Sequence, residues 1–413
     1  MILIIAAIFL VDEDHLRSGF DYACGWNRFN FDLLGIWPRK NATGIAKYRS
    51  LINASVIFLI LVIPRSIALY LFWGQIDAMI QCFSTHMPLI IGMVKLIILY
   101  FQQQVLGEFL EEMEVDWKVV KPTLHHDTMM KMANISRGIS IVSSSMAYAA
   151  NSFGVVKFYN LESFHLKDPD PRLTMNLFWV VCLPFDTSTS INFWVALLLQ
   201  FYASFSGSLS YFAFDSLVAM MIFHLCGQLD LVRLSISQLG EDSETQRVRD
   251  IQAMVRSIVK KHEKLIQSAR NLETAFNFAL LLLTIGCVLT FCFQGYAVIR
   301  VTVNAVRQLN FFQVGFAVTI TLSAVSHLFF CCWAADCLIT KSSAVGDAIY
   351  HSGWYKLPHS KAHFFLLIGF KKFRPLEITS GKFAALSLDL FMKVIKMSMS
   401  YISMLLAVQS RRT

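Results

Sequence analysis

The sequence predicts an all-α membrane protein with seven transmembrane helices. Of the 413 residues, 55% are hydrophobic and 15% are charged, whereas about a quarter of the residues in a typical soluble domain are charged. Several apolar stretches supply the roughly 20 residues that a helix needs to cross a bilayer. We therefore predict a bundle of spanning helices, each of which satisfies its own backbone hydrogen bonds in lipid.

The segment before the first span, residues 1–50, is predicted to be cytosolic. Its apolar residues 1–10 are too few to cross a membrane. The acidic run 12–14 stands where a signal peptide would carry a small-residue cleavage site. We therefore expect a re-entrant or interfacial piece at the start of the chain. Trp37 before Pro38 suits an interfacial anchor that precedes the first span.

Spans one to four are predicted within residues 51–232. Arg65 follows Pro64 near the middle of the first span. A charged side chain at that depth is either functional, or else it is paired with a neighbouring helix or snorkels outward, and we favour this second, non-functional interpretation. The third span is rich in Ser and Ala, which allow close helix contact or leave room for a ligand. The second span is expected to continue as a polar helix through Glu114. The expected limits of the four spans are 51–73, 78–106, 131–155 and 191–228.

The remaining segments differ in character. Residues 156–190 contain the turn signal Asp168-Pro169-Asp170-Pro171, and we predict that they form an extracellular lid. Residues 233–274 are charged but compatible with a helix, which predicts a cytosolic helical extension. Spans five and six are expected within 275–340. Residues 341–381 are polar and basic and are predicted to be cytosolic.

The distribution of basic residues predicts the topology. The net charge is +8, but no basic stripe interleaved with aromatics marks a nucleic-acid surface, so we expect no nucleic-acid partner. Most Lys and Arg residues near the spans lie on the side of the N-terminal segment and of residues 233–274. Such an excess marks the cytosolic side. The N-terminus is therefore predicted to be inside the cell and the C-terminus outside.

The last predicted span, within residues 382–413, is a helix over 382–409 that carries a polar stripe. A membrane helix keeps such a stripe against protein or water rather than lipid. It is therefore either the lining of a pore shared by several chains or a buried seam inside one bundle. At 100° per residue, the stripe comprises Asp389, Lys393, Lys396, Ser400, Ser403 and Ala407.

The cysteines give no sign of a disulfide framework, because most of the nine lie in apolar helices. Cys331, Cys332 and Cys337 form a cluster in sequence but lack paired metal-ligand spacing. We found no convincing cluster of His, Asp or Cys at membrane depth that an enzyme would need. We therefore expect neither a metal site, nor a cofactor, nor enzymatic activity.

Two stretches resemble the insect odorant receptor family. Leu34-Gly35-Ile36-Trp37-Pro38 is similar to the opening motif of the family. Roughly the last 70 residues look like its C-terminal signature, from Ser342-Ser343-Ala344-Val345 through Arg374-Pro375-Leu376 to Ser400-Tyr401. The chain lacks the long insertion of the shared co-receptor, so it resembles a ligand-tuning subunit. A gustatory-receptor-type channel and, less closely, a G-protein-coupled receptor are the alternatives.

This resemblance implies a non-selective, odorant-gated cation channel in the plasma membrane of an olfactory sensory neuron dendrite. The implied partners are the odorant co-receptor in a heterotetramer, a small volatile odorant, membrane lipid and permeating cations. Four copies of the last helix would line one pore, and the region 355–370 would join an anchoring domain. The family's apolar gate corresponds to Met404 and Val408 here. The residues implied to line or gate the pore are Ser400, Ser403, Met404, Ala407 and Val408.

The resemblance also implies a ligand pocket in the outer half of the bundle, between spans two, three, four and six. The matching region here offers aromatic walls with a few hydroxyls, which suit a small and mostly apolar volatile. Ordinary helix packing is the alternative for each single residue, and we expect His86 to be hydrogen-bonded rather than a metal ligand. The predicted ligand-binding residues are Phe83, His86, Ser144, Tyr148, Asn151, Phe201, Tyr202, Phe205, Phe316 and Thr319.

Overall fold

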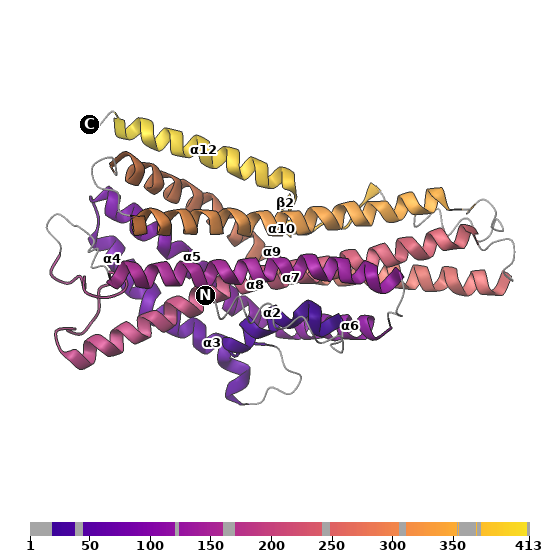
Figure 1. Cartoon of the computed structure of the whole chain (residues 1–413), viewed down its shortest axis with the longest axis horizontal. Coiled ribbons are helices and arrows are strands. Elements are labelled where there is room, and N and C mark those ends of the chain that lie inside the picture. The colour runs from indigo at the N-terminus through magenta and orange to yellow at the C-terminus, as the bar shows by residue number, and fades with distance from the viewer. Residues whose placement is uncertain are drawn as a thin grey trace.

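The computed structural model is almost entirely helical and confirms the predicted fold class (Figure 1). Among the described residues, six helices are long and apolar enough to cross a membrane, and they correspond to the first six predicted spans. The predictions for residues 1–10, 12–14 and Pro38 lie outside the described residues. The structure describes residues 19–37, 44–119, 124–159, 170–241, 248–304, 311–352, 354, 369 and 373–410.

The elements run along the chain as a series of helices interrupted by one small hairpin. The longest helices lie side by side along the long axis of the molecule (Figure 1). The helices are α2 (Gly19–Leu33), α3 (Ile45–Ile57), the π-helix η1 (Phe58–Val62), α4 (Ile63–Leu71), α5 (Ile76–Phe101), α6 (Gln103–Val119), α7 (Leu124–Tyr159), α8 (Ser190–Glu241), α9 (Val248–Asn304), α10 (Phe311–His351) and α12 (Leu388–Ser410). The two strands are β1 (Thr379–Ser380) and β2 (Ala384–Ala385).

The first span is not a uniform helix, because η1 interrupts it between α3 and α4. Pro64 is the second residue of α4, two positions after the end of η1. Proline lacks a backbone N–H, and its ring collides with the carbonyl one turn earlier, so a regular α-turn cannot pass through it unchanged. A widened π-turn accommodates this conflict.

The second span ends earlier than predicted. The sequence predicts one helix from residue 78 through Glu114, but α5 stops at Phe101 and α6 starts at Gln103. The backbone of Gln102 leaves helical geometry, with φ −100° and ψ 14°. α6 then buries an apolar face that includes Phe109, Met113 and Trp117. Tertiary packing of α6 thus overrides the helical continuity that local sequence indicates.

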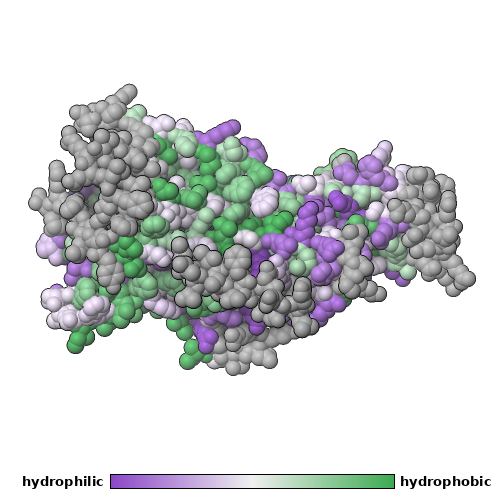
Figure 2. Space-filling view, in the orientation of Figure 1, coloured by the Kyte–Doolittle hydropathy of each residue, from purple (hydrophilic) through white to green (hydrophobic). Residues whose placement is uncertain are grey.

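Four helices are longer than a bilayer requires. α7 has 36 residues, α8 has 52, α9 has 57 and α10 has 41, whereas about 20 residues span the hydrocarbon core. Figure 2 shows hydrophobic surface gathered over the half of the molecule where α5 and α12 lie, and more hydrophilic surface toward the half where α8 ends and α9 begins. The helical extension predicted over 233–274 is therefore a direct continuation of α8 and α9.

The last helix begins at Leu388 rather than at Lys382 as predicted. The residues before it form the β1–β2 hairpin, whose turn holds Gly381 at φ 60° and Lys382 at φ 64°. Glycine adopts this left-handed conformation without steric cost. The Ser387 hydroxyl then accepts a hydrogen bond from the Leu390 backbone N–H at 3.2 Å, which is the pattern of a helix N-cap.

One face of α12 packs against α9 and α10. Val394, Ser398 and Ile402 are buried on this face, and their spacing of four residues places them on one side of a helix. The Ile402 side chain lies against Gly295 of α9, where an added Cβ would be 2.3 Å from its terminal carbon. The predicted polar stripe lies on the opposite side, where Lys393, Lys396, Ser400, Ser403 and Ala407 are exposed on the single chain.

α5 and α8 approach each other closely at two glycines. A Cβ on Gly92 would lie 2.5 Å from the backbone oxygen of Gly207. A Cβ on Gly207 would lie 2.9 Å from a side-chain carbon of Leu89. Small residues allow such close contact between membrane helices. The two helices are thereby held together beside the residues that form the candidate site.

We expect Gly92→Ala to lower the stability of the protein by about 1–3 kcal/mol, the usual range for overpacking, because a backbone oxygen cannot rotate away. The thermal unfolding midpoint of the protein in detergent micelles measures this effect. Gly138→Ala in α7 is the matched control, since its added Cβ would meet nothing within 4 Å. Equal midpoints for the two variants would contradict the close approach.

Candidate functional site

A partly open cavity of about 90 Å³ lies among α5, α7, α8, α9 and α10. One buried water needs roughly 10–15 Å³ in this measure, so the cavity has room for a small organic molecule. Its walls are mainly apolar, with a few amide and hydroxyl groups. The lining residues are Thr85, Pro88, Leu89, Ala150, Asn151, Gly154, Phe178, Trp179, Ser204, Ser208, Tyr211, Phe212, Thr290, Ile320, Ser323 and Ala324.

Trp179, from the segment predicted to be a lid, lines the cavity. The backbone N–H of Trp179 donates to Gln200 Oε1 at 3.1 Å, and its indole Nε1–H donates to Ser204 Oγ at 3.3 Å. The Arg65 guanidinium lies 4.3 Å from the centre of the Trp179 ring, which is a cation–π distance. Trp179 is therefore fixed by contacts with α8 and α4.

Arg65 is paired, which confirms the interpretation favoured from the sequence. Its Nη2 donates to the Cys82 carbonyl at 3.1 Å and to Thr85 Oγ1 at 2.7 Å. Arg65 thus links α4 both to α5 and, through Trp179, to the lid. These contacts offset part of the cost of burying Arg65, and two of them are made with residues of the cavity wall, Thr85 and Trp179.

Two acidic residues within the segment 156–190, Asp170 and Asp186, have lowered pKa values. The side chain of Arg172 donates hydrogen bonds to Asp170 and lowers the pKa of that carboxyl to about 2. Hydrogen bonds from Ser188 lower the pKa of Asp186. Both carboxylates are therefore ionised at neutral pH, and each closes a local turn.

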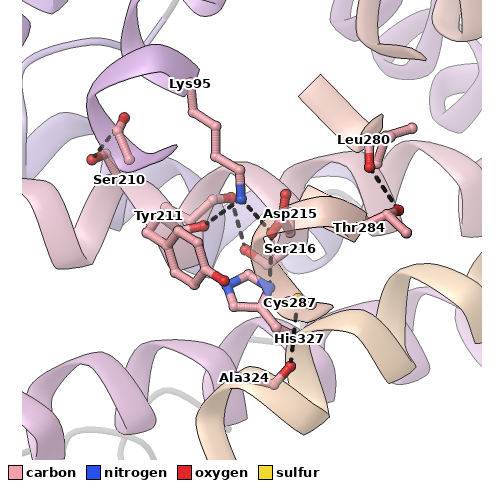
Figure 3. A network of polar contacts seen from close by, with 12 residues as sticks. Lys95, Ser210, Tyr211, Asp215, Ser216, Leu280, Thr284, Cys287, Ala324 and His327 are labelled. Carbon is pink, nitrogen blue, oxygen red and sulfur yellow. Dashed lines mark hydrogen bonds and ion pairs between the residues drawn. The ribbon is translucent and has the colours of Figure 1, made fainter. Parts of the chain in front are cut away.

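A buried charge cluster, formed by Lys95, Asp215 and His327, lies beside the cavity (Figure 3). Lys95 Nζ lies 2.6 Å from Asp215 Oδ2, and His327 Nδ1 lies 2.8 Å from the same oxygen. These residues come from α5, α8 and α10, and each is at most 3% exposed. Lys95 Nζ also donates to the Tyr211 carbonyl at 3.2 Å. The cluster therefore joins three spans to the backbone of a cavity-lining residue.

Aromatic rings connect the charge cluster to the cavity. The His327 ring stacks on Phe212 at a centroid distance of 4.7 Å and contacts Tyr211 edge-on at 4.5 Å. Lys95 Nζ lies 4.3 Å from the centre of the Tyr211 ring. Because Tyr211 and Phe212 also line the cavity, a molecule bound there would touch the same rings that border the cluster.

Our sequence predictions did not include this cluster, although a signal was present. Lys95, Asp215 and His327 are ionisable residues within three different apolar spans. Such residues mark functional or structural polar contacts by default. Among the described residues, no group of three or more His, Cys, Asp and Glu side chains has a geometry that would hold a metal ion.

Of the ten predicted ligand-binding residues, Asn151 lines the cavity. Ser144 and Tyr148 lie below it and hydrogen-bond to Asn30 of α2, at 2.6 and 3.1 Å. Phe205 stacks on Tyr148 at 6.1 Å. These three residues form a layer behind the cavity wall. Whether they affect a ligand stays a prediction.

The other predicted ligand-binding residues whose side chains the structure describes do not line the cavity. Phe83 contacts Phe293 edge-on at 4.8 Å. His86 Nε2 lies 3.1 Å from Ser66 Oγ, which confirms a hydrogen-bonded histidine. Phe201 and Tyr202 are 41% and 48% exposed. Thr319 donates to the Gly315 carbonyl at 2.7 Å, and the side chain of Phe316 lies outside the described residues.

The predicted pore residues occupy the free side of α12. Ser400, Ser403, Met404 and Ala407 are exposed on the single chain, and the side chain of Val408 lies outside the described residues. Lys393 Nζ lies 2.6 Å from Asp389 Oδ2, so the stripe pairs one of its two positive charges. Among the described residues, the polar side chains of this face are exposed on the single chain.

The fold and the cavity define a multi-pass helical membrane protein that can enclose a small molecule. The structure is similar to the insect olfactory receptor OR5 from Machilis hrabei in complex with eugenol, with a TM-score of 0.77 and 15% identity over 94% of this chain and 100% of that chain. A family model described as 7tm Odorant receptor matches residues 75–399. The chain belongs to the odorant receptor family.

Curated relatives from the same family are distant in sequence. Odorant receptor 67c of Drosophila melanogaster is 22% identical over 56% of this chain and 55% of its own length. Odorant receptor 13a of the same species is 29% identical over 54% of this chain and 56% of its own length. The chain therefore spans about half the length of the curated relatives it matches. These matches favour an odorant receptor over the gustatory-receptor and G-protein-coupled-receptor alternatives.

We expect Lys95→Met to lower stability by about 3–5 kcal/mol, because it leaves Asp215 buried without its ammonium partner. Replacing both charges, in Lys95→Met with Asp215→Leu, should recover part of this loss. Thermal unfolding in detergent measures both variants. Lys118→Met breaks an exposed ion pair with Glu114 and should change stability by about 1 kcal/mol or less. Additive losses in the double variant would contradict a paired charge cluster.

Proposed function

We propose that this protein is the ligand-tuning subunit of an odorant-gated cation channel in the plasma membrane. The observation that carries the proposal is the mainly apolar cavity within the bundle, with aromatic and hydroxyl groups in its wall. Pockets of this character bind small organic ligands. The similarity to an olfactory receptor solved with eugenol supports a volatile ligand of similar size for this chain.

The ligand would contact the cavity wall formed by the lid, α7 and α8. Trp179, Tyr211 and Phe212 offer aromatic surface, and Asn151 and Ser208 offer polar groups joined by a 2.6 Å hydrogen bond. Aromatic side chains bury a large area at defined positions. The layer of Ser144, Tyr148 and Phe205 would act indirectly, by setting the position of this wall.

The pore would be lined by the free face of α12 in a tetramer. This face is polar and exposed, and it lies opposite the seam of Val394, Ser398 and Ile402. Acyl chains solvate such groups poorly, so water-filled space between subunits is their natural surroundings. Met404, Ala407 and Val408 would form an apolar ring at the end of the stripe, which can stop permeating cations by dewetting.

The partner in the tetramer would be the odorant co-receptor. The odorant receptor coreceptor of Ooceraea biroi is 25% identical to this chain over 38% of the chain and 33% of that protein. This match covers less of either chain than the matches to odorant receptors 67c and 13a do, which supports a tuning subunit rather than the shared subunit. We further propose an inside N-terminus, an outside lid, and a location in the dendrite of an olfactory sensory neuron.

Ligand binding would open the pore by a population shift. A ligand that contacts the cavity more favourably in the open state stabilises that state. The helix α9 lines the cavity with Thr290 and contacts α12 through Gly295. A displacement of α9 at the cavity would therefore be transmitted directly to the pore helix.

We expect Trp179→Ala to reduce ligand potency by about ten-fold or more, since a buried aromatic contact is worth about 1.5–3 kcal/mol, and to leave ion permeation unchanged. The measurement is ligand-evoked current in cells that express the chain with the co-receptor, tested with an odorant panel. Trp194→Ala is the matched control, because Trp194 is 56% exposed and does not line the cavity. The proposal fails if no odorant evokes a current from the wild-type pair.

We expect Met404→Ala to raise the current without ligand, because a smaller side chain weakens an apolar barrier to ions. Current in the absence of odorant, normalised to surface expression, measures the leak. Met399→Ala serves as control: Met399 and Met404 are 61% and 64% exposed, but five helical residues turn them to different faces. The same leak in both variants would argue against Met404 as part of the gate.

A further inference from the structure

Thr290 differs from the other polar residues of the cavity wall in its hydrogen bonding. It lies in α9, lines the cavity and is 2% exposed. Its hydroxyl oxygen is buried and has no hydrogen-bond partner among the described residues. A buried hydroxyl without a partner is costly compared with one that is bonded. An unpaired polar group in the wall of a binding cavity therefore calls for an explanation.

The other side-chain polar groups around the cavity are engaged. Asn151 donates to Ser208 at 2.6 Å, and Ser204 accepts from Trp179 at 3.3 Å. Thr85 accepts from Arg65 at 2.7 Å. Ser323 donates to the Thr319 carbonyl at 2.6 Å. These polar groups of the wall thus form hydrogen bonds within the chain, whereas the Thr290 hydroxyl does not.

Thr290 also departs from the behaviour of other threonines in these helices. Helical Ser and Thr hydroxyls commonly bond to the carbonyl one turn earlier. Thr284, in the same helix, donates to the Leu280 carbonyl at 2.9 Å, and Thr319 of α10 donates to the Gly315 carbonyl at 2.7 Å. Thr290 has no such bond. Its hydroxyl is therefore available to a molecule in the cavity.

We propose that Thr290 is a specificity-determining residue that donates a hydrogen bond to an acceptor oxygen of the ligand. This inference rests on the proposed function and names the ligand class. The ligand would be a neutral volatile with one carbonyl-type oxygen directed at α9 and an apolar remainder against Trp179 and Phe212. None of the described lining residues is charged, so an ionised ligand would lose its hydration without compensation.

The test compares Thr290→Val, which removes the hydroxyl at similar volume, with Thr290→Ser, which keeps it. The probes are two pairs of matched shape: acetophenone with α-methylstyrene, and 2-heptanone with 2-methyl-1-heptene. Potency is measured as evoked current with the co-receptor. Binding is measured separately, as the ligand-induced shift in the thermal unfolding midpoint of the purified chain.

We expect the wild-type chain to prefer the ketone in each pair that it binds. Thr290→Val should weaken ketone binding by about ten-fold, the value of a single neutral hydrogen bond, and should not weaken binding of the hydrocarbon. Thr290→Ser should retain the ketone preference. A hydrocarbon gains nothing from the hydroxyl, so its affinity separates the loss of a hydrogen bond from a change in cavity shape.

Three results would overturn the inference: equal binding of ketone and hydrocarbon by the wild-type chain, an equal loss for both probes in Thr290→Val, or no ketone binding in either assay up to the solubility limit. Failure of the proposed function is a separate result. If ketones shift the unfolding midpoint in a way that depends on the Thr290 hydroxyl, but no odorant evokes a current, the ligand class stands and the channel assignment falls.

Discussion

The arrangement of the bundle depends on the joint burial of Lys95, Asp215 and His327. A single charge in such surroundings costs several kcal/mol, on the order of 3–5 when its partner is removed. The cost is offset only when the ammonium and the imidazole both reach the same carboxylate oxygen. Because each group belongs to a different helix, this condition is met in one register of α5, α8 and α10. The charge cluster thus selects one packing among the many that apolar helices allow.

The helix packing that the charge cluster selects also determines the shape of the cavity. At the cluster, the Tyr211 carbonyl accepts a hydrogen bond from Lys95, which fixes the backbone of the inner wall. At the lid, Trp179 is held by Gln200, Ser204 and Arg65. A cavity whose walls are fixed at both ends does not need to order its side chains when a ligand enters, which lowers the cost of binding. A conformational change caused by ligand binding must then be a displacement of the helices themselves.

Sequence patterns predicted the parts of the structure that depend on composition and periodicity. They indicated six of the spans, the pairing of Arg65 and a polar stripe along one side of α12. They failed where a local feature or a distant contact determines the limits of a helix. The two cases are the break at Gln102 and the start of α12 at Leu388 after a left-handed turn. The residues of the cavity wall were harder still to predict from the sequence. α8 is apolar on all sides and buried over much of its length, so a helical wheel gives no face to choose.

α2 explains why several predicted ligand-binding residues lie behind the cavity wall. This helix precedes the first span, yet Asn27 and Asn30 are fully buried in the bundle. Asn30 hydrogen-bonds to Ser144 and Tyr148, and Asn27 accepts from Ser216 at 2.6 Å. Polar groups on α7 and α8 that would suit a ligand are therefore satisfied by the chain itself. Since Tyr148 stacks on Phe205, α2 also supports the layer beneath the cavity. Most buried polar groups of the bundle thus form hydrogen bonds within the chain. Few of them, above all the Thr290 hydroxyl, remain available to a bound molecule.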